Sequence, residues 1–294
     1  MKYAWIKQYR DEFPVAVMCR VLNVSKSGFY GWLKRPESKR AKRTRAIHAA
    51  VRKVYEDSGQ IYGSYKIAQK LKQYKHLETA CRNTVANAMH EMELKSCVSG
   101  KFKPTTTESD PSKKPAGNVL AQKFSADAPN QKWVADITYL PVSGGWVYLA
   151  VVLDLYSRKV VGWEMSDRLT TPIVTTALRK AIESRRPQRG TLLHHSDRGC
   201  QYTSDAFQKI LRTMEITCSM SRTGCCYDNA VMERFFWSLK QEWTRHRQYK
   251  NLKEARVSVF KYIETFYNSK RIHQTLGYMT PDEFERNYRA ALAA

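Results

Sequence analysis

Three carboxylate residues, Asp136, Asp197 and Glu233, occupy positions that could support metal chemistry. Asp136 interrupts the apolar segment WVADITYL, although aspartate is depleted in strands because its desolvation must be compensated. Asp197 directly follows the short apolar segment TLLHHS, and ligands of open α/β sheets collect at the carboxyl ends of strands. Glu233 lies one turn inside an amphipathic helical segment. Taken singly, each could equally be an ordinary surface, turn or helix residue.

Convergence of the three carboxylates would be unfavourable unless cations held them together. Mg²⁺ prefers oxygen ligands and bridges to substrate phosphates, and Mn²⁺ is the alternative ion. Two such ions about 4 Å apart could activate a water or a 3′-hydroxyl and stabilise the leaving oxygen of an in-line displacement. Lys240 lies two turns after Glu233 on the same helix face, where it would contact a phosphate of the substrate.

Two other groups of residues compete for a functional role. His195 is two residues before Asp197, so it shares that face of the strand and is expected to line the same site. Asp154, in VVLDLYSR, is a further carboxylate, to which we assign a supporting role. A zinc site can also be imagined from five residues, but their spacing matches no familiar zinc knuckle. These residues are His194, His195, Cys200, Cys225 and Cys226.

The charge balance indicates a polyanionic partner, most simply a nucleic acid. The chain has 50 Lys and Arg against 27 Asp and Glu, a formal net charge of +23, and each cationic contact to a phosphate releases condensed counterions. No uninterrupted apolar run could span a membrane, and the first 14 residues contain no apolar signal-peptide core. Seven cysteines, without a CxxC pair, favour reduced thiols. We therefore expect a cytoplasmic, nucleoid-associated protein without a membrane partner.

The first part of the chain reads as helical and basic. We predict a basic helical segment at 1–45, with a helix over Pro14–Arg20 and Ser25 capping the next. Seven of the twelve residues from Lys34 to Arg45 are Lys or Arg, which fits an arm along phosphates or a solvated connector. Three helical patterns over 46–97, with Ser64 as a candidate cap, resemble a helix-turn-helix DNA-binding domain. Residues 98–124 read as a linker.

The pattern then changes to strands, in a core predicted at 125–245. Strands at 132–142, 146–155 and 159–165 are close enough for an antiparallel meander, with Gly144-Gly145 at the first turn. Helices and short strands alternate after it, up to a long helix at 229–245 that Asp228 would cap. This order predicts an α/β fold, a mixed five-stranded sheet flanked by helices. A helix at 252–267 begins a C-terminal helical extension at 246–294.

The segment from Trp133 to Glu242 resembles the OrfB-type transposases of the bacterial insertion sequences typified by insertion sequence three. The matching blocks are WVADITYLP, LAVVLDLYSRKVVGWEMS, HHSDRGCQYTS, SMSRTGCCYDNAVMERFFWSLKQE and YNSKRIHQTLGYMTP, and the upstream YEDSGQIYGSYKIAQKL resembles the family's helix-turn-helix region. Thirty-five residues separate Asp197 from Glu233, as in the DDE signature of that family. The resemblance covers nearly the whole chain.

This resemblance implies a ribonuclease-H-like fold, shared with retroviral integrases, and a catalytic, metal-binding triad of Asp136, Asp197 and Glu233. The implied reaction is metal-assisted DNA cleavage at the element's ends, followed by attack of a 3′-hydroxyl on a phosphodiester. Lys240 matches a basic position that contacts terminal DNA, and Arg271 and His273 of the tail are expected DNA contacts. A homo-oligomer on DNA and an upstream-frame protein, or a fusion with it, are the implied partners.

Three positions depart from the usual pattern of these transposases without removing a carboxylate: Cys200, Cys225 and Arg234. Two other functions remain open at this point. A nuclease of the ribonuclease-H type would cut DNA without joining it, although the tail with YNSKRIHQ would then be surplus. A DNA-binding repressor derived from such an element would be expected to have lost a carboxylate, and all three are present.

Overall fold

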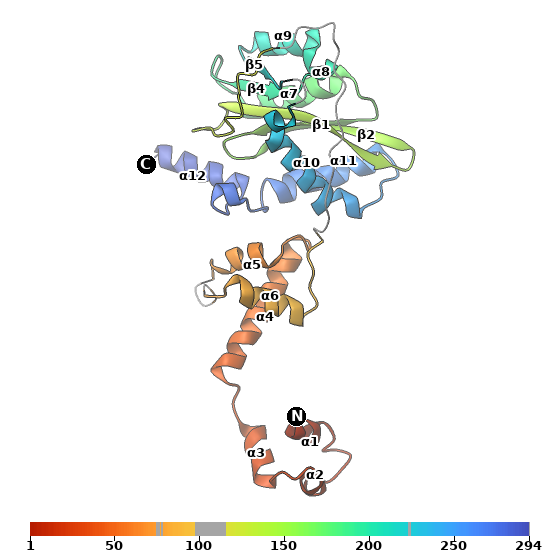
Figure 1. Cartoon of the computed structure of the whole chain (residues 1–294), viewed down its shortest axis with the longest axis vertical. Coiled ribbons are helices and arrows are strands. Elements are labelled where there is room, and N and C mark those ends of the chain that lie inside the picture. The colour runs from red at the N-terminus through yellow and green to blue at the C-terminus, as the bar shows by residue number, and fades with distance from the viewer. Residues whose placement is uncertain (75–76, 78, 98–115, 223–224, 294) are drawn as a thin grey trace.

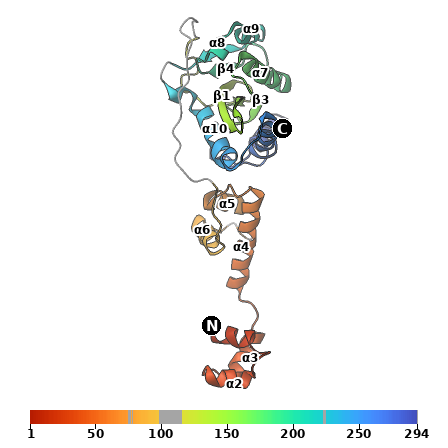
Figure 2. The same ribbon diagram turned by 90° about the vertical axis from the view of Figure 1, so that its right-hand side faces the viewer.

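The computed structural model describes residues 1–74, 77, 79–97, 116–222 and 225–293. Figure 1 and Figure 2 show three parts in chain order: a small N-terminal helical unit, a second helical unit with the long helix α4, and a sheet covered by helices. The predicted linker at 98–124 lies outside the described residues as far as residue 115. In the described parts of the chain, no helix is long and apolar enough to cross a membrane.

The N-terminal unit contains three helices around a small core of its own. These are α1 (Lys2–Gln8), α2 (Val15–Val21) and α3 (Lys26–Lys34). The core consists of Ile6, Met18, Cys19 and Phe29. Ser25 caps α3 by accepting a hydrogen bond from the backbone N–H of Gly28 at 2.9 Å, which confirms the predicted cap.

The second helical unit confirms the three predicted helices, and it packs directly on the sheet domain. It comprises α4 (Lys39–Asp57), α5 (Ser64–Leu71) and α6 (Arg82–Glu91). The cap predicted at Ser64 is wrong, because Gly63 holds the capping position and makes no side-chain bond. The Tyr62 hydroxyl donates to the Lys270 carbonyl and accepts from the Ile272 N–H, each at 3.0 Å. These bonds attach the unit to the C-terminal segment of the sheet domain.

The sheet has five strands in the order β3-β2-β1-β4-β5. An antiparallel meander of β1 (Lys132–Val142), β2 (Gly145–Asp154) and β3 (Val160–Ser166) forms one half. The short strands β4 (Leu193–Ser196) and β5 (Thr217–Met220) add in parallel beside β1. Gly145 turns between β1 and β2 at φ 133°, in the left-handed region that glycine tolerates. The meander and the mixed five-stranded sheet are as predicted.

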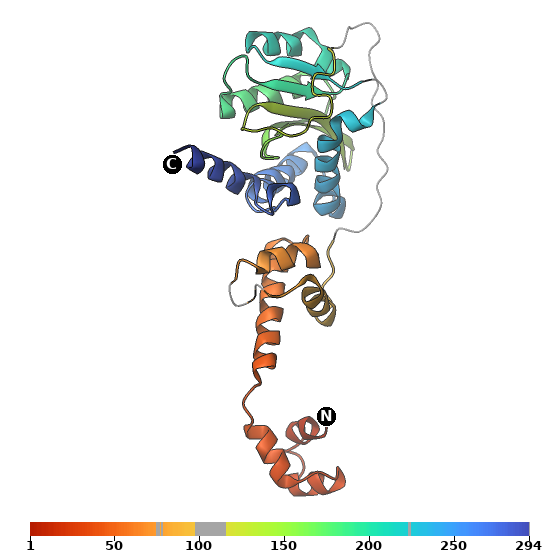
Figure 3. The same ribbon diagram turned by 60° about the vertical axis from the view of Figure 1, so that its left-hand side comes forward.

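Alternating residues of β1 give the sheet two apolar faces, each covered by helices. Trp133 and Ala135 face one side, and Val134 and Leu140 face the other. The first face carries α7 (Thr171–Arg185), α8 (Cys200–Thr203) and α9 (Asp205–Thr213); the second carries α10 (Ala230–Glu242), α11 (Leu252–Phe260) and its π-helical continuation Lys261–Tyr267. Figure 3 shows the sheet between these two layers. This arrangement confirms the predicted ribonuclease-H-like class, preceded by an all-α region.

Two predictions about α10 are wrong. Asp228 does not cap it, because a 3₁₀ turn over Cys226–Asn229 precedes the helix. The Asp228 carboxylate instead accepts hydrogen bonds from Arg222 and from the side-chain amides of Asn118 and Gln122. The helix also ends at Glu242, before a second 3₁₀ turn over Thr244–His246, and not at 245.

The last part of the predicted linker is attached to the core. Leu120 is buried, and the Ser219 hydroxyl on β5 accepts hydrogen bonds from the backbone N–H groups of Val119 and Leu120 at 2.9 and 3.0 Å. Residues 116–124 therefore belong structurally with the sheet domain.

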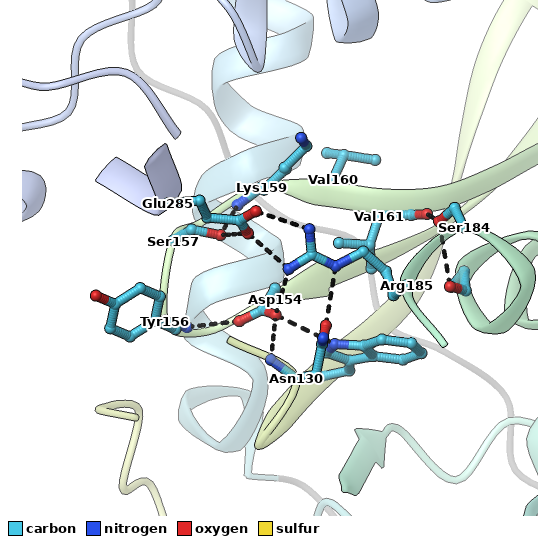
Figure 4. Close-up of polar contacts among 12 residues, drawn as sticks. Asn130, Asp154, Tyr156, Ser157, Lys159, Val160, Val161, Ser184, Arg185 and Glu285 are labelled. Carbon is cyan, nitrogen blue, oxygen red and sulfur yellow. Dashed lines mark hydrogen bonds and ion pairs between the residues drawn. The ribbon is translucent and has the colours of Figure 1, made fainter. Parts of the chain in front are cut away.

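The C-terminal helix α12 (Pro281–Ala293) is attached to the sheet domain through one buried carboxylate. Glu285 forms two hydrogen bonds, of 2.7 and 2.8 Å, with Arg185 of α7, and it accepts a third from Ser157 at 2.7 Å. Figure 4 shows Arg185 between Glu285 and Asp154, with Asn130 on its other edge. The 3₁₀ turn Gln274–Leu276 precedes α12 in the chain.

Candidate active site

The pairing of β1 with β4 brings Asp136 and Asp197 close to each other. The last pair of the ladder is Val134 with His195; Asp136 follows two residues later on β1, and Asp197 follows directly after the end of β4. The charge of Asp197 raises the pKa of Asp136, as expected of neighbouring carboxylates. Neighbouring strands are about 4.8 Å apart, and residues of equal register point to the same face. Asp136 is half-buried and accepts a hydrogen bond from the Ile137 N–H at 2.7 Å. Sequence periodicity alone could not give this pairing, because it depends on which strands are neighbours.

The turn after β4 holds the Asp197 carboxylate through its own backbone. The Gly199 N–H donates to Asp197 Oδ1 at 2.9 Å. A Cβ placed on Gly199 would lie 3.0 Å from that same oxygen, so any larger residue would crowd the carboxylate. Gly199 therefore permits the close approach that fixes the orientation of Asp197.

Helix α10 presents Glu233 above the strand that carries Asp136. The Asn229 side-chain amide, at the start of the helix, donates to the Ala135 carbonyl of β1 at 3.2 Å. Met232 and Phe235 pack into the core on either side of Glu233 in the sequence, whereas Glu233 itself is exposed. The helix is thus anchored one residue away from Asp136, with its first-turn carboxylate outside the core.

The electrostatics of the three carboxylates show crowding. The pKa of Asp136 is raised well above its usual range, first by burial, then by the negative charge of Asp197 and more weakly by that of Glu233. The pKa of Glu233 is raised by desolvation. Lys240 lowers the pKa of Asp136 only as the smallest contribution, and burial lowers the pKa of Lys240 itself. At Asp136 the two effects that favour the neutral carboxyl, burial and neighbouring negative charge, therefore outweigh that of Lys240.

The donor set suits a hard divalent cation, although the three carboxylates do not yet enclose one. Neighbouring carboxylate oxygens are the donors that Mg²⁺ or Mn²⁺ would bind. Among the residues that the structure describes, no three His, Cys, Asp or Glu side chains lie close enough to hold a metal ion. Of the three carboxylates, Asp136 and Asp197 influence each other most strongly, and Glu233 is exposed at the start of α10.

Tyr202 is a neighbour of the carboxylates that the sequence analysis did not single out. It is 2% exposed on α8, and its hydroxyl has no hydrogen-bond partner among the described residues. Burial raises its pKa well above the usual value, and the charges of Asp136 and Asp197 raise it further. A buried hydroxyl without a partner beside two carboxylates is a donor available to a ligand or water at the site. Its only signal in the sequence was its place in the HHSDRGCQYTS block.

Lys240 lies on the side of α10 that overlooks β1. It is half-buried, and its Nζ is 4.8 Å from the ring centroid of Tyr139. Its effect on the pKa of Asp136 places its charge near the carboxylates. This position is compatible with the predicted phosphate contact.

The structure gives Arg271 different surroundings from those expected of a DNA contact. Arg271 is buried, and it binds both oxygens of Glu242, through Nε at 2.7 Å and Nη2 at 2.6 Å. Its Nη2 also reaches the Ser238 hydroxyl at 3.3 Å. His273 is half-buried against the Tyr267 ring, and burial and Arg271 lower its pKa well below the usual value. Arg271 thus joins the tail to α10.

A basic cavity of about 690 Å³ lies where α5, α10 and the tail meet. Its lining includes Lys66, Arg158, Arg234 and Arg271, with Glu242 as its acidic residue. Burial, with Arg271 as the next cause, lowers the pKa of Lys66 to about 8. The helix that carries Glu233 therefore has a positively charged hollow on its other side.

Two of the competing residues, His195 and Asp154, have polar partners within the fold. His195 is fully buried, and its ring nitrogens lie 2.8 Å from Ser219 Oγ and 3.1 Å from Ser221 Oγ. His194 points to the opposite face of β4, into a cluster with Phe207, so the two histidines cannot share one zinc ion. Asp154 accepts hydrogen bonds from the backbone of Asn130 and Tyr156 and lies 3.6 Å from Arg185. It supports the fold.

Comparison with known proteins agrees with this architecture. Residues 126–226 and 214–281 match two family models described as "Integrase core domain", and residues 42–102 match an "HTH-like domain". The chain is 39% identical over 287 residues to "Transposase InsF for insertion sequence IS3A" of Escherichia coli (strain K12), covering 97% of this chain and 98% of that protein. It is 36% identical over 276 residues to "Insertion element IS600 uncharacterized 31 kDa protein" of Shigella sonnei, covering 94% and 100%.

A more distant similarity is found among solved structures. The HTLV-2 integrase catalytic core domain in complex with magnesium is 18% identical, with a TM-score of 0.41, over 54% of this chain and 98% of that one. So weak a likeness carries no argument about function. The IS3A transposase, by contrast, is similar to this chain from end to end. This chain also matches the HTH-like and integrase-core models, in the order in which the structure presents a helical unit and the sheet domain. On that ground the chain belongs to the family of IS3-type insertion-sequence transposases.

Proposed function

We propose that this transposase cleaves DNA at the ends of its element and joins the freed 3′-hydroxyl to target DNA, with Asp136, Asp197 and Glu233 as its catalytic residues. The observation that carries the assignment is the closeness of Asp136 and Asp197, since β1 and β4 are neighbouring parallel strands and the charge of Asp197 raises the pKa of Asp136. Family membership supports the type of reaction, and the geometry of the pair supports the choice of residues.

The three carboxylates would hold Mg²⁺ or Mn²⁺, with two ions as the expected number. Such ions, when bound, activate the attacking oxygen and stabilise the leaving oxygen of a phosphodiester. The chain contributes orientation: the Gly199 N–H fixes Asp197, and Asn229 anchors α10 so that Glu233 lies above β1. Tyr202 offers a hydroxyl donor beside the two aspartates.

The substrate in this proposal is double-stranded DNA, both at the element's ends and at the target. The net charge of +23 supports it, because phosphate contacts by Lys and Arg give affinity through counterion release. Of the three predicted DNA contacts we retain Lys240, which borders the carboxylates, because Arg271 is occupied by Glu242 and His273 packs against Tyr267. A homo-oligomer on DNA, and an upstream-frame protein or fusion, remain the proposed partners.

The test is strand joining by a Glu233→Gln variant. Labelled duplexes are made from the inverted repeats that flank the gene and are incubated with the full chain and Mg²⁺. Glu233→Gln should bind these duplexes as the unchanged chain does, yet yield no joined product. Glu183→Gln changes an exposed helical glutamate on α7 and serves as the matched control, with joining intact. Undiminished joining by Glu233→Gln would contradict the site, and cutting without joining by the unchanged chain would favour a nuclease.

A further inference from the structure

The N-terminal unit, residues 1–35, has the local geometry of a second helix-turn-helix. Helix α2 ends at Val21 and α3 begins at Lys26, which leaves a four-residue connection. Asn23 in that connection has a φ of 50°, and the next N–H, of Val24, donates to the Cys19 carbonyl at 3.0 Å. Two helices joined by a turn of three or four residues form the motif that places its second helix in the major groove of DNA. The matched HTH-like domain begins only at residue 42.

Helix α3 has one buried side and one open side. Phe29 is 1% exposed and fills the small core, while the opposite side is exposed at helical spacing. Five exposed residues form this open side: Lys26, Ser27, Tyr30, Gly31 and Lys34. We call this set the α3 surface. It contains two cations, a hydroxyl and a phenol, which are groups that contact phosphates and base edges.

The two glycines of α3 differ in a way that points to a ligand. At Gly28, a Cβ would lie 2.4 Å from the Tyr3 hydroxyl, so tight packing of α1 on α3 explains that glycine. At Gly31, a Cβ would meet nothing within 4 Å, although glycine weakens a helix interior. No contact within the described chain explains Gly31. A backbone left bare on an exposed face permits the helix to approach another molecule closely.

The charge of the unit matches a nucleic acid. Residues 1–35 contain seven Lys and Arg and two Asp and Glu, and the two acids, Asp11 and Glu12, lie between α1 and α2. Helix α3 contains no acidic residue. Of the unit's large exposed apolar and aromatic side chains, only Tyr30, which also carries a hydroxyl, lies on the α3 surface. The others are Met1, Trp5, Phe13, Val17 and Val21. The α3 surface is therefore cationic and polar, as a duplex requires.

We infer that residues 1–35 form a second DNA-reading domain, whose α3 surface enters the major groove of duplex DNA with Gly31 at the closest approach. This domain is separate from the α4–α6 unit and is joined to it by residues 35–38, which lie between the end of α3 and the start of α4. The inference shares one assumption with the proposed function, namely that the protein binds double-stranded DNA. It adds a recognition surface that the match to the HTH-like domain does not cover.

The experiment uses the full chain and a pool of duplexes with a randomised centre. Duplexes are selected with the unchanged chain, and affinity for the selected sequence is then measured for variants. Gly31→Gln and Lys26→Ala should each weaken binding by about tenfold, the scale of one good base contact. Lys7→Ala removes the same charge from exposed α1 and should stay within about twofold. Methylation of guanine N7, in the major groove, should interfere with binding at the positions that α3 reads.

Gly31→Gln separates this effect from misfolding. Glutamine is a better helix former than glycine, so the variant should keep or raise its melting temperature while it loses DNA affinity. Unchanged DNA affinity of both α3 variants would overturn the inference. If their oligomeric mass changed while their DNA affinity did not, the α3 surface would contact a second copy of the chain and not DNA. If the α3 variants lose DNA affinity while the Glu233→Gln variant still joins strands, the active-site assignment is contradicted and the α3 inference stands.

Discussion

Two groups of carboxylates on the same sheet are treated in opposite ways by the fold. Asp154 and Glu285 converge on Arg185, which binds Glu285 through two hydrogen bonds, while Asn130 and Tyr156 donate backbone N–H groups to Asp154 (Figure 4). Burial raises the pKa of Asp154, although hydrogen bonds from Asn130 and Tyr156 and the charge of Arg185 oppose it. In Glu285 the bonds from Arg185 outweigh burial and lower the pKa. Asp136 has instead a second aspartate as its closest charged influence, and its pKa is raised well above the usual range.

This difference separates carboxylates that an arginine holds from those that we propose bind an external cation. The chain supplies an arginine where a carboxylate holds two elements together, as Arg185 does for α7 and α12 and Arg271 does for Glu242. At Asp136 the charge of Lys240 is instead a small contribution, and the larger influences are burial and the charge of Asp197. Two carboxylates this close to each other lower the stability of the folded protein. Such destabilising arrangements are typical of functional sites, where the chemistry needs them.

The strongest test of the comparison is Asp136→Asn. Removing one charge from the pair should lower strand joining on the order of a thousandfold, or about 4 kcal/mol of transition-state stabilisation. The same change in Asp154, which holds structure, should lower joining only in proportion to the folded fraction. Joined product per folded molecule is the measurement. Equal specific losses in both variants would remove the distinction between the two groups.

Removal of Arg185 should show the structural side of the comparison. Arg185→Met leaves Asp154 and Glu285 buried without their cation and is expected to lower the free energy of unfolding by about 3–5 kcal/mol. Arg189→Met is the matched control, because its ion pair with Glu215 is exposed and should contribute less than about 1 kcal/mol. Urea denaturation measures both. A small effect at Arg185 would mean that α12 is held mainly by its other contacts.

Mg²⁺ should stabilise the folded protein through Asp136 and Asp197 and not through Asp154 and Glu285. At a Mg²⁺ concentration 100 times its Kd, the free energy of unfolding should rise by about 2.7 kcal/mol through binding to the folded state alone. Asp136→Asn should lose this gain. Denaturation in Mg²⁺ and in EDTA gives the difference, and a Mg²⁺ effect that survives in Asp136→Asn would place the ion elsewhere.

The raised pKa of Asp136 sets a pH dependence of the metal-free protein. Between the ordinary pKa and the raised one, the folded state binds more protons than the unfolded state, so stability falls as pH rises through this window. The slope should reach at most about 1.4 kcal/mol per pH unit and should disappear in Asp136→Asn. Denaturation in EDTA at several acidic pH values measures it, and a rising slope specific to Asp136 would contradict the crowding.

The smallest expected effect concerns Lys240. If it contacts one phosphate, Lys240→Ala should reduce the slope of log affinity against log salt by about 0.9, with little change in stability. Lys253→Ala on the exposed part of α11 is the control and should leave the slope unchanged. Equal slopes for both variants would show that Lys240 serves the carboxylates and not the DNA.

The sequence by itself determined the local elements, because the signals for them are local. Alternation in residues 132–142 predicted a strand with Asp136 on a defined face, the two glycines at 144 and 145 predicted the hairpin, and Ser25 predicted a helix start. The three carboxylates could be selected because their chemical type and their spacing, within blocks typical of a family, were visible without a structure.

Only the tertiary structure decided what each charged side chain meets. Asp228 was predicted to cap α10, but it bonds to Asn118 and Gln122 from more than a hundred residues away. Arg271 was predicted to contact DNA, but Glu242 occupies its guanidinium. The Asp136–Asp197 pairing arose from strand order, which periodicity does not encode. An ionisable group's role depends on its neighbours in space, because charge interactions act through distance and burial and not through sequence separation.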